Sequence, residues 1–101
     1  MNSINITGRI TTKPELKFTG NEKKAVVSFS IAFNRGEEQV DFFNVVAYEK
    51  QAENLCKFVD KGDMLAVSGR LTTRSYTNKE NQQVNVVEII ASNITFITKK
   101  D

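Results

Sequence analysis

The sequence predicts an all-β fold, a five-stranded barrel with one α-helix between the third and fourth strands. Three observations predict it. Five segments alternate apolar and polar residues with the period of a strand, and one segment switches to the period of a helix. Glycines fall inside two of the strands, where a short sheet can bend and close on itself. At 101 residues the chain fits one domain.

The first three predicted strands cover residues 4–10, 25–34 and 40–48. In the first, Gly8 takes a position where an inward side chain is expected, which indicates a bend or a close backbone approach. Pro14 then marks an irregular stretch, followed by a turn at residues 19–21. The second strand alternates most cleanly. Its inward face is expected to be Val27, Phe29, Ile31 and Phe33.

Residues 49–61 are predicted to form the helix. Ala52, Leu55, Cys56 and Val59 fall at i, i+3, i+4 and i+7, which is one apolar stripe of an amphipathic helix. Gly62 is expected to end it. Cys56 is interpreted as a small buried apolar residue of this stripe and not as a reactive thiol.

The last two predicted strands cover residues 64–76 and 83–97, joined by a polar loop. Leu65, Val67 and Leu71 are expected to point inward, with a bend at Gly69. The run 86–90 is apolar on both faces and is expected to be covered on both. Five strands with a helix after the third is the layout of an OB-fold barrel. An SH3-like barrel would lack the helix.

Composition excludes several classes of function. Histidine is absent and cysteine occurs once, so neither a Cys/His zinc cluster nor histidine-based catalysis can form. No phosphate-binding loop or nucleophile motif is present. We therefore expect no enzyme, no cofactor and no metal. No apolar run approaches the ~20 residues of a membrane helix. With no signal peptide visible and a single cysteine, a cytoplasmic location is expected.

The charges are unevenly distributed. Net charge is +2, but residues 1–35 carry six basic and two acidic side chains, residues 36–63 three and seven, and residues 64–101 five and three. One side of the surface is therefore expected to suit a polyanion.

The outward face of the central strands carries the candidate binding residues. A filled barrel does not need aromatic side chains outside, yet aromatic residues and arginines alternate there. Unpaired bases stack on exposed rings at about 1–3 kcal/mol per base, and guanidinium groups contact phosphates. The pattern predicts binding of single-stranded nucleic acid, most simply DNA, with little sequence preference. On the third strand these residues are Phe42, Asn44 and Tyr48, and Val46 is expected on the same outward face. On the fourth strand they are Arg70, Thr72, Arg74 and Tyr76, and at the end of the second Asn34 and Arg35.

Structural alternatives exist for several of these residues. A register slip of one would place Phe42 in the core. Tyr48 could cover the start of the helix, and Arg70 and Arg74 could form an ordinary solvated stripe. The aromatic and basic residues together are more specific than any one of them.

The chain resembles the bacterial-type single-stranded DNA-binding proteins over nearly its whole length. The resemblance implies an OB-fold domain over residues 1–98, with 99–101 as a short end, that assembles as a homotetramer (a dimer being the alternative) and protects DNA during replication, recombination and repair. It implies stacking on Phe42, Tyr48 and Tyr76, and phosphate or base contacts from Arg9, Arg35, Arg70 and Arg74. The loop around Lys79 resembles a flexible arm. The segments that carry the resemblance are residues 5–16, 31–35, 41–54, 61–76, 88–91 and Phe96.

The sequence departs from that family in two places. No aromatic residue occupies positions 36–40, where the family usually has a further stacking residue, and no acidic tail follows residue 101. Either a tail was trimmed from this sequence or the chain is a tail-less form such as a phage or plasmid version, so recruitment of replication or repair proteins cannot be assumed. Two other functions compete: a dimeric primosome-type accessory module that acts through protein contacts, and an oligosaccharide-binding or enzymatic domain.

Overall fold

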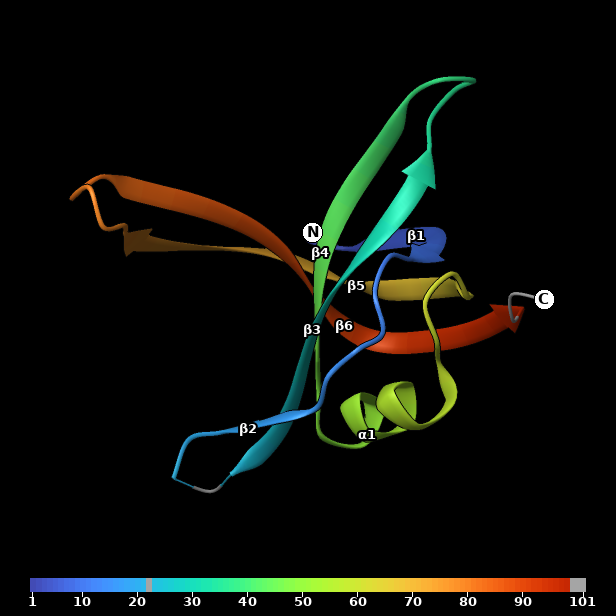
Figure 1. The fold of residues 1–101 in the computed structure, drawn as a ribbon, viewed down its shortest axis with the longest axis horizontal. Coiled ribbons are helices and arrows are strands. Elements are labelled where there is room, and N and C mark those ends of the chain that lie inside the picture. Colours follow the sequence, from blue (N-terminus) through green and yellow to red (C-terminus); the bar gives the residue numbers. More distant parts are fainter. Residues whose placement is uncertain (22, 99–101) are drawn as a thin grey trace.

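The computed structural model describes residues 1–21 and 23–98 and contains six strands and one helix (Figure 1). The elements in chain order are β1 (Ile4–Ile10), β2 (Lys17–Thr19), β3 (Lys24–Asn34), β4 (Val40–Tyr48), α1 (Glu49–Phe58), β5 (Met64–Thr77) and β6 (Gln83–Thr98). The expected position of residues 99–101 as a short end lies outside the described residues.

Five of the strands pair in a closed ring. β1 pairs with β5, β5 with β6, β6 with β4 and β4 with β3, and β1 also pairs with β3 at Arg9↔Ala32 and Ile10↔Ile31. All pairs are antiparallel except β4 with β6. The helix lies between the third and fourth strands of this ring. The predicted all-β OB-fold architecture is confirmed. The sixth strand, the three-residue β2 on the edge of β3, was not predicted.

The core is built from the alternating faces that the sequence predicts. Val27, Phe29 and Ile31 of β3 expose at most 5% of their surface. The helix contributes Ala52 and Leu55, which are fully buried. β4 passes directly into α1, with Glu49 at φ +55°. This sharp turn presses the apolar stripe of the helix against β3 and β4.

Two glycines allow backbones to approach closely. A Cβ on Gly8 would lie 2.6 Å from the carbonyl oxygen of Ala32, at the junction where β1 meets β3. A Cβ on Gly69 would lie 2.1 Å from the carbonyl oxygen of Ile90, next to an irregularity in the β5–β6 register at Ser68/Gly69. Any larger residue would force these strands apart.

Two hairpins extend beyond the barrel, and this corrects three expectations about side-chain burial. The β3–β4 and β5–β6 hairpins both project away from the closed ring (Figure 1). Leu71 and Phe33, predicted inward, are 42% and 39% exposed, and Val87, predicted covered, is 56% exposed, because past the ring a hairpin has no opposing sheet. Conversely Val46, predicted outward, is 6% exposed, since it is flanked within the sheet by Ser28 and Ile90.

The helix ends earlier than predicted. It stops at Phe58, and the N–H of Val59 still donates to the Leu55 carbonyl before the chain becomes extended. Gly62 lies in the turn that follows, at φ +93°, and its N–H donates to the carbonyl of Ile10. The glycine therefore serves the turn from the helix into β5 and does not cap the helix itself.

Candidate nucleic-acid interface

The outer face of β4 carries two exposed aromatic side chains. Phe42, Asn44, Val46 and Tyr48 alternate along one face of the strand because side chains of a strand repeat every two residues. Phe42 is 65% exposed and Tyr48 46% exposed, so neither is a core residue. They are six positions apart along the strand, or about 20 Å. Two rings at this spacing can stack with two bases that are not neighbours along a nucleic-acid strand.

Tyr48 does not cap the helix that it precedes. It occupies the N-cap position of α1 without a side-chain hydrogen bond to the helix. Its cross-strand partner is Val26 of β3, and Val26 in turn pairs with Lys17 of β2. Directly paired residues share one face of a sheet, so Lys17, Val26 and Tyr48 form one row.

Lys17 is a candidate contact that the sequence analysis missed. Together with Thr12 and Lys13 it borders a surface recess of about 440 Å³ that also includes Glu15, Val26 and Ser28. The sequence does show basic residues, Lys13 and Lys17, on either side of Pro14. Without a strand at 17–19, nothing placed those residues next to Tyr48.

The outer face of the β5–β6 hairpin carries the predicted arginine and tyrosine. Arg74 and Tyr76 are on the same face, with the Arg74 Cζ 5.8 Å from the centre of the Tyr76 ring, close enough for a cation–π contact. Tyr76 is 47% exposed. The Arg74 Nε also donates to Glu88 Oε1 at 2.9 Å. Arg70 and Thr72 precede them on this face, opposite Ile90 and Glu88.

A recess of about 360 Å³ joins the two faces. It brings together Asn44 from β4, Arg74 from β5 and Glu88 from β6, with the hydroxyls of Ser28 and Ser30 from β3. Ser28 also borders the recess beside Lys17. The barrel face and the hairpin face therefore form one continuous surface that passes through Ser28.

Arg9 is placed near Phe42 by the strand register. Arg9 pairs with Ala32, and Ala32 pairs with Phe42, so the three share one row across β1, β3 and β4. The Arg9 Nη1 donates to the carbonyl of Gly62 at 2.9 Å. This bond holds one edge of the guanidinium toward the helix–β5 turn.

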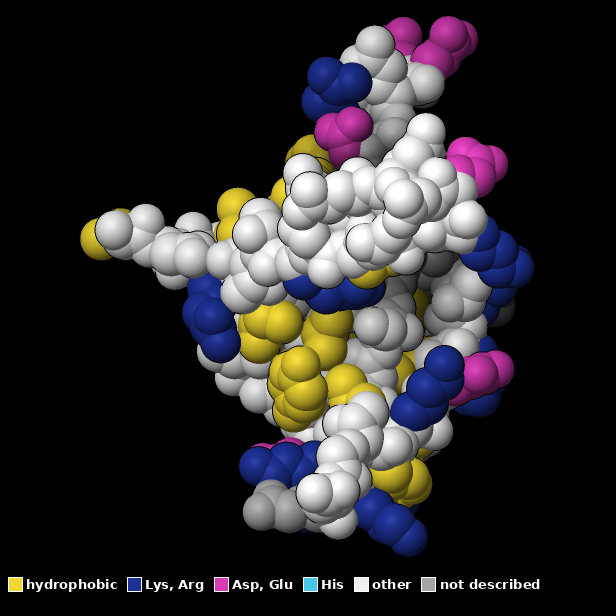
Figure 2. Space-filling model, turned by 90° about the vertical axis from the view of Figure 1, so that its left-hand side faces the viewer, with side chains coloured by type: hydrophobic (Ala, Val, Ile, Leu, Met, Phe, Trp, Pro, Cys, Tyr) yellow, Lys and Arg dark blue, Asp and Glu magenta, His cyan; other side chains and the backbone are white. Residues whose placement is uncertain are grey.

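Two predicted residues lie away from this surface. Asn34 and Arg35 are at the end of the β3–β4 hairpin, and the Arg35 Nε lies 3.2 Å from Asp41 Oδ2. Acidic side chains gather there, at the top of Figure 2. A phosphate contact at Arg35 would have to compete with that carboxylate.

Lys79 lies at the tip of the β5–β6 hairpin, beyond Tyr76. The turn is ordered by Asn78, whose Oδ1 accepts hydrogen bonds from the N–H groups of Glu80 and Gln82. Figure 2 views the molecule from the side of this hairpin, with apolar side chains lying among Lys and Arg side chains beneath its polar end.

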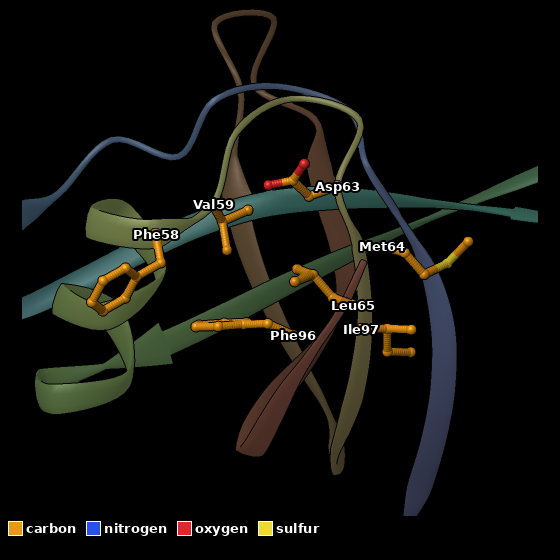
Figure 3. A pocket seen from close by; sticks show the side chains of 7 residues that line it. All are labelled: Phe58, Val59, Asp63, Met64, Leu65, Phe96 and Ile97. Carbon is orange, nitrogen blue, oxygen red and sulfur yellow. The ribbon is translucent and has the colours of Figure 1, made fainter. Parts of the chain in front are cut away.

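A second apolar surface lies elsewhere on the barrel and includes none of the predicted binding residues. Phe58 and Phe96 lie with ring centres 6.4 Å apart and border a pocket of about 220 Å³ together with Met64 and Ile97 (Figure 3).

Burial raises the pKa of the Cys56 thiol, partly opposed by the charge of Lys13. The described part of the chain has no group of three or more potential metal ligands, and none of its helices could cross a membrane.

Comparison with known proteins finds one family model and several relatives that all carry the same description, single-stranded DNA binding. The single-strand binding protein family matches residues 1–97. Single-stranded DNA-binding protein 1 of Staphylococcus aureus (strain Mu50) is 43% identical over 107 aligned positions, which cover 100% of this chain and 68% of that protein. Single-stranded DNA-binding protein 2 of S. aureus (strain COL) is 42% identical, with 100% and 76% covered. Single-stranded DNA-binding protein A of Bacillus subtilis (strain 168) is 40% identical, with 100% and 62% covered.

Proposed function

The chain belongs to the single-strand binding protein family, and on this premise we propose that it binds single-stranded DNA with little sequence preference and without turnover. Bases stack on Phe42, Tyr48 and Tyr76, and arginines and Lys17 contact the backbone. In this role it protects unpaired strands during replication, recombination and repair. The observation that supports this proposal is that three exposed rings lie on the two strands, β4 and β5, that supply Asn44 and Arg74 to one recess.

The direct test is a fluorescence anisotropy titration with labelled oligo-dT, repeated at several salt concentrations. Backbone contacts release counterions, so the logarithm of the association constant should fall linearly with the logarithm of salt concentration. Double-stranded DNA of the same length should compete weakly, because paired bases do not expose their faces for stacking. Equal competition by the duplex would remove stacking from the account.

We also propose that the protein assembles into a homotetramer, for which an exposed apolar patch is the support. Leu71 and Val87 are 42% and 56% exposed and border a recess with Ile4 and Phe43. Phe42, Asn44 and Glu88 line the same recess, so it adjoins the proposed DNA-binding surface. Contiguous apolar surface of this kind is typical of an association site. Leu71→Glu should reduce the sedimentation coefficient to that of a smaller species. A wild-type protein that sediments as a dimer would favour the primosome-type accessory module instead.

A further inference from the structure

The tip of the β5–β6 hairpin is held closed by a single side chain, that of Asn78. Its Oδ1 accepts hydrogen bonds from the N–H groups of Glu80 at 3.0 Å and Gln82 at 2.9 Å. Its Nδ2 donates to Gln82 Oε1 at 3.3 Å. In the backbone, the Asn78 N–H donates to the Gln82 carbonyl and the Asn81 N–H to the Asn78 carbonyl. Every one of these bonds involves Asn78, so residues 79–82 depend on it for their conformation.

The residues of this turn suit one fixed conformation. The bond from the Asn81 N–H to the Asn78 carbonyl, at 3.1 Å, closes a β-turn over residues 78–81. Asparagine is favoured at the first position of such a turn, because its side chain accepts from the backbone two residues on. Asn81 has φ +64°, a left-handed conformation that asparagine tolerates better than most residues. The turn can therefore form without support from the barrel.

Packing contributes little to the order of this tip. The hairpin extends beyond the barrel (Figure 1), and Lys79, Glu80, Asn81 and Gln82 are all exposed. Lys79 and Glu80 are neighbours of opposite charge. In a disordered tip the two charges would sample the same space and give a chain of phosphates no net attraction. An ordered turn holds them at separate positions, so that a strand can meet the ammonium group of Lys79 without the carboxylate.

We propose that Asn78 is a positioning residue for DNA binding: it pre-orders the hairpin tip so that Lys79 contacts the backbone of a strand stacked on Tyr76. The inference rests on the proposed binding of single-stranded DNA. A tip that is already ordered avoids the entropy cost of fixing the loop when the strand binds. Asn78 lines neither the recess that holds Arg74 nor the apolar recess proposed for assembly, so truncating it leaves both surfaces intact.

The test is an anisotropy titration with labelled oligo-dT of about 16 nucleotides, the upper end of the range for one OB-fold site. The dissociation constant should rise about tenfold in Asn78→Ala, the factor for fixing the backbone of about one freed residue. Asn78→Ser should recover part of the loss, because a hydroxyl oxygen accepts from the same N–H groups more weakly. Asn93→Ala is the matched control and should bind like the wild type, since Asn93 lies opposite Ser68 within the barrel and away from the tip.

A double-mutant cycle with Lys79→Gln separates positioning from a general loss of stability. In the Lys79→Gln background, Asn78→Ala should weaken binding by about twofold or less, because the contact that it positions is already gone. A purely structural effect would weaken binding by the same factor in both backgrounds. That result, or an unchanged affinity in Asn78→Ala, would overturn the inference and leave the proposed function standing. If the wild type does not bind oligo-dT, the proposed function fails and the inference fails with it.

A second measurement, on the protein without DNA, tests the order of the tip directly. Amide hydrogen exchange followed by NMR should show that the N–H groups of Glu80 and Gln82 are protected in the wild type. Their exchange should be about tenfold faster in Asn78→Ala, the size of one lost hydrogen bond. Asn93→Ala should leave both rates unchanged. Equal rates in Asn78→Ala and the wild type would mean that Asn78 does not order the tip, and would overturn the inference.

Discussion

Phe42→Ala should weaken DNA binding by more than it lowers the stability of the folded protein. Phe42 is 65% exposed, so about a third of its surface is buried in the protein. Full burial of a phenylalanine side chain contributes about 1.5–3 kcal/mol, and a third of that is about 0.5–1 kcal/mol of folding stability. Phe29, by contrast, is 5% exposed, and truncating a core phenylalanine of this kind costs about 3–5 kcal/mol. The binding loss should be larger than the folding loss, about 1–3 kcal/mol for one stacked base.

The assay is anisotropy with labelled oligo-dT, with thermal unfolding followed by circular dichroism on the same samples. The dissociation constant should rise about 5- to 150-fold, which corresponds to the loss of one stacked base. Phe58→Ala is the control, because Phe58 is 52% exposed but lies beside Phe96, away from the β4 face. Since Phe42 also borders the apolar patch, sedimentation must show an unchanged assembly. An unaltered affinity in Phe42→Ala, with the protein folded and assembled, would refute the stacking account.

Three further predictions follow from individual contacts. Arg74→Gln should weaken binding of all sequences and flatten the salt dependence by about 0.7, the slope for one phosphate contact on a single strand; an unchanged slope would place phosphates elsewhere. Gly69→Ala should destabilise the fold by about 1–3 kcal/mol in urea, because its Cβ would meet the Ile90 carbonyl oxygen, whereas Gly36→Ala has open space and should unfold at the wild-type midpoint. Burial raises the folded-state pKa of Cys56, so the stability contributed by its neutral thiol is present below the unfolded-state pKa and lost as pH rises through the folded-state pKa. Urea midpoints measured from pH 7 to 10 should fall less in Cys56→Ala than in the wild type, and parallel curves would contradict this.

The sequence predicted the strands that form the closed ring because each has one buried face. β1 and β4 have the predicted bounds, and β3, β5 and β6 differ by one residue at an end. Strict alternation is a local signal, and burial inside the ring enforces it. Residues at the ring itself, such as Val27 and Ile31, therefore face the core as predicted.

Errors arose where burial depends on distant parts of the chain. Leu71 is on the face of β5 that points inward within the ring, but at this position the β5–β6 hairpin already extends beyond the ring. The alternation of apolar and polar residues does not indicate where a sheet is no longer covered by other strands. β2 was missed because three exposed residues after Pro14 show no alternation and exist as a strand only through pairing with β3. As a result Lys17 was absent from the predicted site. The Arg74–Glu88 pair was also invisible, since the β5–β6 register fixes it.

The central claim is that bases lie against the exposed rings of Phe42, Tyr48 and Tyr76. Ultraviolet cross-linking of an oligonucleotide that carries 5-iododeoxyuridine, followed by mass spectrometry of the cross-linked peptides, tests it directly because the reaction favours aromatic side chains in stacking contact. The account predicts cross-links at these three residues. Cross-links confined to Phe58 and Phe96, on the other apolar surface, would contradict it.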